Sequence, residues 1–245
     1  MNKNELKYKA ADAAIEFRRR FDLGQAAPLR MDVLLAKLDL LTVFAKMSES
    51  FSGMAAKFED NGFLLINCNH VKGRQNFTIC HELYHLFVQK DFQFEIIASN
   101  EDRVKDEHEK LADAFASELL MPEEGIKELL LMQNFLSKQI GIEQIVKLEQ
   151  YFQVSRQAMV YRLVNLGLID KQTDLQKAYF ETVKESAERL GFETQLYEAT
   201  SPKVISSDYF EKGQLLYKQE IIGLADFAQL MDDIGIDIYP LLEQK

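Results

Sequence analysis

Apolar residues recur along this chain with two different periods. Helical spacing covers residues 4–21, and a second, short helical pattern follows Pro28. The period then shortens, and runs rich in β-branched and aromatic residues predict three strands, at 41–44, 54–58 and 63–67. The Glu59-Asp-Asn-Gly62 sequence contains an Asn-Gly pair, which favours a tight hairpin turn. Together these patterns predict a small antiparallel sheet packed with helices.

Helical spacing returns in the rest of the chain. Residues 74–89 carry a single apolar stripe, and residues 101–120 begin acidic and end apolar, as the helix dipole favours. Pro122 ends that helix, and only helices are predicted beyond Glu123. The sequence therefore predicts an α+β fold. Shifts in composition divide it into three segments, at 1–125, 126–170 and 171–245.

Composition and charge exclude several classes of protein. The 245 residues include 29 basic and 39 acidic side chains, a net charge of −10, which disfavours a chain that coats nucleic acid by bulk charge. No apolar run approaches the ~20 residues that span a bilayer. The first residues lack the apolar core of a signal peptide, and two cysteines are too few for a disulfide scaffold. We therefore expect a cytoplasmic protein without a membrane partner.

The residues that could ligate a metal or act as nucleophiles are concentrated in one window. All four histidines and both cysteines lie between positions 68 and 108: Cys68, His70, Cys80, His81, His85 and His108. Within it, His81-Glu82-Leu83-Tyr84-His85 falls on a predicted helix. At about 100° per residue, the two imidazoles lie one turn apart on one face and can reach the same tetrahedral ion. Glu82 lies at the edge of that face, where a carboxylate can accept a proton from an attacking water.

Other interpretations of this pair are two partly exposed helix-surface histidines, or a structural zinc site without catalysis. A zinc site also needs a third protein ligand. The downstream candidates are Glu107, His108, Glu109 and Asp113. On a helical wheel Glu109 shares its stripe with two alanines, which permit close helix packing, whereas Glu107 faces the opposite side. We therefore predict Glu109 as the third ligand.

Asp113 lies one turn beyond Glu109 on the same face. Metal-bound imidazoles usually donate their second N–H to a carboxylate or carbonyl, so Asp113 is predicted to orient His81 or His85. The alternative is a solvated helix carboxylate.

His70 follows the third predicted strand, where an extended peptide could pair with the sheet. There it is a candidate catalytic donor to a developing oxyanion, the alternative being a surface histidine. We expect His108 at the surface and both cysteines as buried free thiols.

Two blocks of this sequence, Arg74–His85 and Glu109–Pro122, resemble the ImmA/IrrE family of bacterial zinc metallopeptidases. The resemblance covers about residues 5 to 170. It implies a gluzincin-like endopeptidase core with a zincin-like fold in residues 1–125, zinc on His81, His85 and Glu109, and Glu82 as general base. It also implies a protein substrate, a helix-turn-helix transcriptional repressor whose cleavage switches on a mobile element or a stress response.

The family usually has glycine and alanine where this sequence has Tyr84 and Cys80. We expect Tyr84 to narrow the cleft and Cys80 to be a small buried replacement.

Residues 142–167 resemble a DNA-binding helix-turn-helix, but they carry three basic against two acidic side chains, a weak phosphate footprint. Direct DNA binding is therefore less favoured than packing or substrate recognition. The acidic segment 171–245 is predicted to be a helical extension for partner binding or sensing. The alternative for the whole chain is a non-catalytic zinc-containing regulator, or a toxin–antitoxin or phage-defence component that acts by protein or DNA binding.

Overall fold

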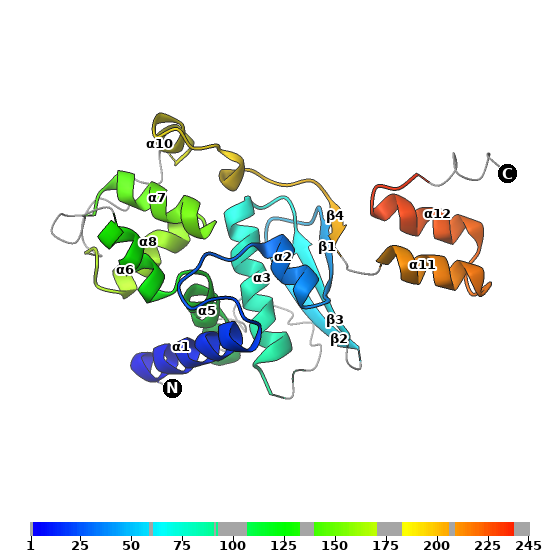
Figure 1. Cartoon of the computed structure of the whole chain (residues 1–245), viewed down its shortest axis with the longest axis horizontal. Coiled ribbons are helices and arrows are strands. Elements are labelled where there is room, and N and C mark those ends of the chain that lie inside the picture. The colour runs from blue at the N-terminus through cyan, green and yellow to red at the C-terminus, as the bar shows by residue number, and fades with distance from the viewer. Residues whose placement is uncertain are drawn as a thin grey trace.

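The computed structural model has an α+β fold, in which a four-stranded sheet packs against helices (Figure 1). It describes residues 2–58, 61–90, 92, 107–132, 140–170, 183–205 and 209–237. Among the described residues, no helix is both long and apolar enough to cross a membrane.

The predicted helices are present with small shifts at their ends. The first five are α1 (Lys3–Arg20), α2 (Met31–Lys37), α3 (Lys72–Phe87), α5 (Glu107–Leu120) and α6 (Glu123–Met132). The later helices are α7 (Ile142–Phe152), α8 (Arg156–Asn165), α10 (Val183–Arg189), α11 (Tyr209–Lys218) and α12 (Leu224–Asp233), with a 3₁₀ turn η1 at Gln195–Tyr197. The first six residues of the predicted helix 101–120 lie outside the described residues.

The strands are β1 (Leu41–Ala45), β2 (Gly53–Phe58), β3 (Asn61–Asn67) and β4 (Lys203–Ile205), in the order β2-β3-β1-β4. The β2–β3 hairpin is antiparallel as predicted, but β1 pairs with β3 in parallel, so the prediction of a wholly antiparallel sheet is wrong. Strand β4, which pairs with β1, also contradicts the prediction that only helices follow Glu123. A three-residue strand is too short to show a period, and its partner is remote in the sequence.

The predicted Asn-Gly turn is wrong in register. Phe58 pairs with Asn61 and Lys57 with Gly62, so the Asn-Gly pair opens β3, and residues 59–60 lie outside the described residues. Glycine serves a different purpose here, because a Cβ at position 62 would lie 2.4 Å from Cδ2 of Leu40. Gly62 therefore allows the Leu40 side chain to pack directly against the strand.

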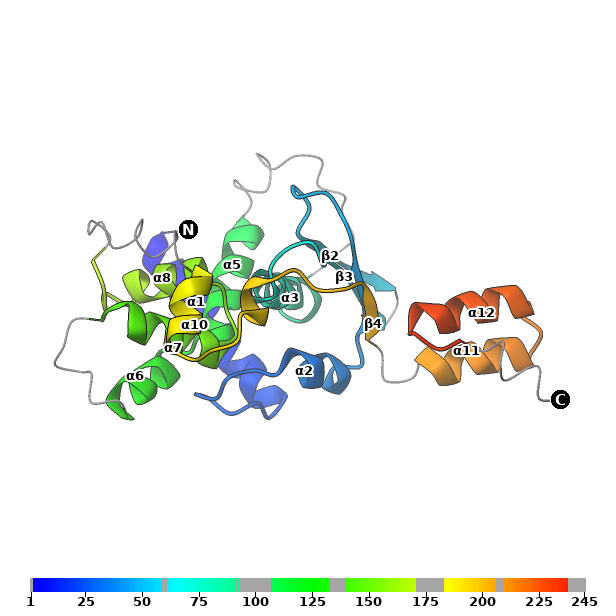
Figure 2. The same ribbon diagram turned by 90° about the horizontal axis from the view of Figure 1, so that it is seen from above.

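Helix α3 lies at the centre of the molecule. It packs against β2 and β3 on one side and against α5 on the other, and α1 covers α5 (Figure 2). The main buried cluster extends from Ala10 on α1 to Leu163 on α8. The helix that carries the paired histidines is therefore packed between the sheet and a second helix.

Arg18 fixes the C-terminal end of α5. Its side chain is 1% exposed, and Nε donates to the Leu119 carbonyl at 3.0 Å, while Nη1 donates to the carbonyls of Gly24 and Ala27. Burial lowers the pKa of Arg18 to about 10, so the guanidinium remains charged at neutral pH. The bond to Leu119 satisfies a carbonyl group that the end of α5 leaves without an intrahelical partner, and the other two bonds hold the segment between α1 and α2.

Helices α7 and α8 form the helix-turn-helix-like hairpin that the sequence indicated. Ser155 caps α8 by accepting a hydrogen bond from the Ala158 N–H at 3.2 Å. Arg162 donates to the Met121 carbonyl at 2.9 Å and forms an ion pair with Glu118 at the end of α5. The hairpin is thereby anchored to the same helix that carries Glu109.

A second arginine of the hairpin is buried in an ion pair. Arg156 donates to both carboxylate oxygens of Glu149 at 2.6 and 2.7 Å, and Tyr197 donates to the same carboxylate. The side chains of Arg156 and Glu149 are 2% and 0% exposed.

Replacing Arg156 by Leu should reduce the free energy of unfolding by ~3–5 kcal/mol, because it leaves the Glu149 carboxylate buried without its main counter-charge. The matched control is Lys147→Leu, which removes an exposed pair with Glu143 and should cost at most ~0.5 kcal/mol. Urea unfolding of the two variants compares the effects, and equal losses would contradict this account of Arg156.

Helices α11 and α12 pack on each other around a small cluster of Phe227, Ala228 and Met231. In Figures 1 and 2 this pair lies beyond β4, to one side of the other helices. The division of the chain into three domains remains a prediction.

Candidate metal centre

The paired histidines lie on α3 where it faces α5. Side chains of His81 and His85 are 15% and 8% exposed. Ala112 and Ala116 on α5 are completely buried, and such small residues allow the two helix backbones to approach closely. This packing brings Glu109, on the first turn of α5, against both imidazoles.

Ligand atoms of three side chains converge at this point. His81 Nε2 lies 3.3 Å from His85 Nε2 and 3.3 Å from Glu109 Oε2, and His85 Nε2 lies 3.5 Å from Glu109 Oε1. A tetrahedral ion with ligands at about 2.0–2.1 Å requires ligand atoms about 3.3–3.4 Å apart. Residues His81, His85 and Glu109 therefore have the spacing of a metal-binding cluster.

The outer nitrogen of each imidazole is held by a hydrogen bond. Nδ1 of His81 lies 2.8 Å from Oδ1 of Asp113, and Nδ1 of His85 lies 2.5 Å from Oε1 of Gln89. With Nδ1–H as donor in both rings, each Nε2 presents a lone pair toward the centre of the cluster. The two rings are thus oriented as metal ligands would be.

The local charges favour a cation at the cluster. Burial disfavours the protonated form of His81, but hydrogen bonds with Asp113 and Glu109 outweigh it and raise the pKa to about 10. Burial dominates for His85 and lowers its pKa. Neighbouring carboxylates therefore stabilise positive charge at His81, carried either by a proton on Nε2 or by a cation that replaces this proton, while the lowered pKa keeps His85 neutral and able to coordinate.

Glu82 lies beside this cluster and outside it. Its side chain is buried, and with His81 and Glu109 it lines a cleft of about 430 Å³. Ser52 and Gly53, at the start of the edge strand β2, form part of the cleft wall. The cleft therefore adjoins the cluster, the Glu82 carboxylate and the sheet edge.

His70 is not brought to the cluster. It lies just beyond β3, is 8% exposed, and its Nε2 is 3.1 Å from the Glu49 carbonyl. It is not among the described residues that line the cleft, so no contact supports a role as oxyanion donor. The alternative of a surface histidine is wrong, because the ring is buried.

Tyr84 and His108 contact each other behind the site. The Tyr84 hydroxyl oxygen lies within hydrogen-bond distance of Nδ1 of His108, at 3.1 Å, and the Tyr84 ring packs edge-on against His85. Tyr84 is 4% exposed and does not line the cleft among the described residues, so the expectation that it narrows the cleft is wrong. His108 is half-buried rather than a simple surface residue.

Both cysteines are buried free thiols, as predicted, and burial raises the pKa of the Cys80 thiol.

The contact of Gln89 with His85 was not predicted from the sequence. Its i+4 spacing from His85 was the available signal, because residues four apart share a helix face. Gln89 lies just past the last residue of α3, however, where helical spacing alone does not fix a side chain.

The side chains of His81, His85 and Glu109 could together hold a metal ion. The model of a metallopeptidase family, Peptidase_M78, described as the IrrE N-terminal-like domain, matches residues 36–164, more than half of the chain. The chain belongs to this family. Over 104 residues it is also 32% identical to Metallopeptidase ImmA of Bacillus subtilis (strain 168). That alignment covers 42% of this chain and 57% of the relative's length.

Proposed function

We propose that this protein is a zinc-dependent endopeptidase that cleaves a specific protein, a helix-turn-helix transcriptional repressor, and so switches on a mobile-element or stress response. The observation that carries the proposal is the convergence of His81, His85 and Glu109: the two Nε2 atoms lie 3.3 Å apart, and they lie 3.3 and 3.5 Å from the two Glu109 carboxylate oxygens. The family membership and the similarity to a protein named Metallopeptidase ImmA support the reaction class.

The donor set favours zinc at this site. Two imidazole nitrogens and one carboxylate oxygen are typical of catalytic zinc, which keeps a fourth position open, whereas structural sites usually have four protein ligands. Bound zinc supplies Lewis acidity, polarising the scissile carbonyl and lowering the pKa of water.

Glu82 is the proposed general base. Its carboxylate lines the cleft beside His81, so it can accept a proton from the attacking water and then pass that proton to the leaving amine. A structural zinc site needs no such carboxylate next to its ligands.

Strand β2 is the proposed docking edge for the substrate backbone. It ends the sheet order and pairs with β3, and its first residue, Gly53, borders the cleft. An extended peptide can pair with such an edge through main-chain hydrogen bonds. Gly53 allows this edge to pack closely on α3, because a Cβ there would lie 2.6 Å from the Thr78 side chain.

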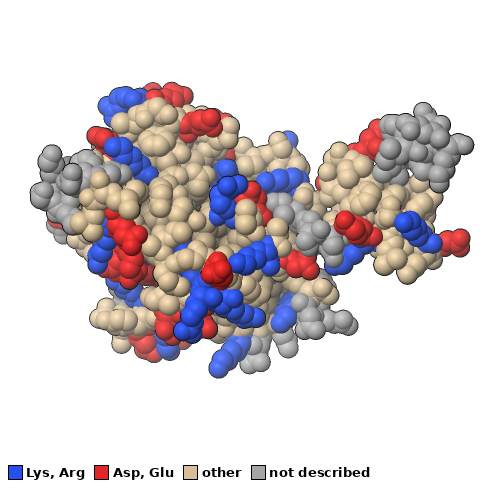
Figure 3. Space-filling model, in the orientation of Figure 1, with Lys and Arg blue, Asp and Glu red and all other residues tan. Residues whose placement is uncertain are grey.

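We propose that the α7–α8 hairpin does not read DNA. Two of its three basic side chains, Arg156 and Arg162, are buried in ion pairs, and the third, Lys147, pairs with Glu143. On the face shown in Figure 3, basic and acidic side chains are intermingled over the main body of the molecule. Phosphate binding needs clustered cations that are free to reach the backbone of DNA.

The substrate proposal is tested by incubating the zinc-loaded protein with the purified helix-turn-helix repressor encoded nearest to its gene, with and without 1,10-phenanthroline. A new repressor fragment that disappears with the chelator and returns with added zinc is expected. An intact repressor would contradict the substrate assignment, and a fragment that persists with chelator would contradict metal dependence.

Asp113→Ala should bind zinc ~10–100-fold more weakly while remaining folded, because His81 loses the acceptor that orients its ring. A competition titration with a zinc-binding dye measures the affinity. Asp12→Ala, an exposed carboxylate on α1, is the matched control and should leave affinity unchanged. Equal zinc affinities for the two variants would contradict the role of Asp113 in orienting His81 and would make Asp113 a solvated surface carboxylate.

A further inference from the structure

The cleft beside the cluster continues into a second cavity of about 570 Å³. Four residues belong to the walls of both cavities: Arg74 and Phe77 from α3, and Lys110 and Asp113 from α5. The two cavities therefore form one groove, which runs from the candidate metal centre to helix α8.

The N-terminal end of α8 forms the far wall of this groove. Ser155, Gln157, Ala158 and Tyr161 all line the second cavity. A helix N-terminus presents backbone N–H groups and the positive end of the helix dipole. In a DNA-binding hairpin this end of the second helix would meet base edges, whereas here it faces the groove.

Two exposed cations line both parts of the groove. Arg74 comes from α3 and Lys110 from α5, and Nη2 of Arg74 donates to the Ser52 hydroxyl at 3.0 Å, which holds the guanidinium at the rim. The one acidic residue among the described lining of the second cavity, Asp113, is engaged by His81. In a chain with a net charge of −10, this stretch of the groove is locally positive.

The remaining wall is apolar. Leu6, Phe77, Ala114 and Ala158 line it, and Tyr161 is 52% exposed although it is a large aromatic side chain. Exposed aromatic residues in a concave site typically anchor an apolar group of a ligand.

We propose that this groove binds the substrate polypeptide through an acidic side chain held between Arg74 and Lys110, with a large apolar side chain against Tyr161. The identity of the occupant as a substrate rests on the peptidase function proposed above. The positive charge and the apolar wall select which segment of the substrate binds. The N-terminal end of α8 contributes to the recognition of this segment.

The test uses the zinc-loaded Glu82→Gln protein and two pools of fluorescent decapeptides. The pools have random sequence except for a central Glu-x-Leu in one and Gln-x-Leu in the other. Fluorescence anisotropy should show ~10-fold tighter binding of the Glu pool at low salt, and the advantage should shrink as salt rises. Adding Tyr161→Ala should weaken the binding of both pools.

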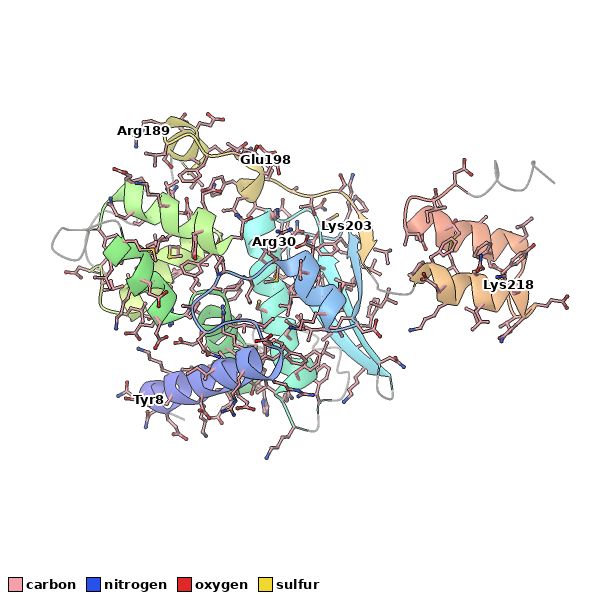
Figure 4. The ribbon with its side chains drawn as sticks, viewed as in Figure 1. Tyr8, Arg30, Arg189, Glu198, Lys203 and Lys218 are labelled. Atoms are coloured by element: carbon pink, nitrogen blue, oxygen red, sulfur yellow. The ribbon has the colours of Figure 1, made fainter. Side chains whose placement is uncertain are left out.

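Lys110→Glu should abolish the preference for the Glu pool. Lys218→Glu makes the same change of charge on α11, away from α3 and α5 (Figure 4), and should preserve it. Equal binding of the two pools, binding of neither pool, or equal effects of the two charge reversals would overturn the proposal.

A separate measurement keeps this proposal distinct from the peptidase function. The protein with Glu82 intact is incubated with both pools, and cleavage is read by mass spectrometry. Selective binding of the Glu pool without cleavage would support the groove and refute the peptidase. Equal cleavage of the two pools would support the peptidase and refute the groove.

Discussion

The Glu82→Gln variant should retain its zinc and its melting temperature but cleave protein substrate ~10²–10⁴-fold more slowly, the usual contribution of a general base. Glutamine keeps the size of the side chain and its hydrogen-bonding shape, but it cannot accept the proton of the attacking water. Glu82 lies in the cleft wall beside His81 and outside the metal-binding cluster, so the metal site should be preserved.

Cleavage rate, zinc content and melting temperature are measured together on this variant. Glu123→Gln, which alters an exposed carboxylate on α6, is the matched control and should behave as the unmodified protein. Cleavage by Glu82→Gln at the unmodified rate would refute the proposed mechanism. Loss of zinc from Glu82→Gln would instead indicate that Glu82 is itself a zinc ligand.

Removing Glu109 should lower zinc content from about one per chain to near zero after dialysis, and cleavage should be lost with it. Two imidazoles alone provide too few protein ligands for a stable site. In addition, the Glu109 carboxylate contacts both Nε2 atoms and supplies the negative charge that offsets the cation. Elemental analysis of Glu109→Ala measures the metal, and His85→Ala should lose it too.

Glu107→Ala is the matched control, because Glu107 begins the same helix but is not part of the metal-binding cluster. It should retain zinc. If Glu109→Ala kept full zinc while Glu107→Ala or His108→Ala lost it, the assignment of the third ligand would be wrong.

The candidate site was largely predictable because its geometry is mostly local. His81 and His85 are four residues apart, and a helix fixes the relative direction of such a pair whatever surrounds it. Glu109 could be chosen from its neighbours because two alanines on its stripe, Ala112 and Ala116, indicated a closely packed helix face, and both are buried. The same wheel placed Asp113 within reach of an imidazole, and the structure pairs it with His81.

Residues outside such local patterns were placed incorrectly or missed. His70 and Tyr84 have no periodic neighbour that indicates their surroundings; the structure buries both, and neither is among the described residues that line the cleft. Gln89 was missed because the hydrogen bond with His85 forms just beyond the end of the helix.

The sequence by itself determined the positions of the helices, the β2–β3 hairpin and the helical face shared by His81 and His85, since each depends on contacts within a few residues. Tertiary structure alone decided the parallel pairing of β1 with β3 and the addition of β4 to the sheet. It also decided that Arg162 fastens the hairpin to α5 and that the end of α8 faces a groove. The physical reason is that hydrophobic period records which face of an element is buried, but it carries no information on which distant element covers that face.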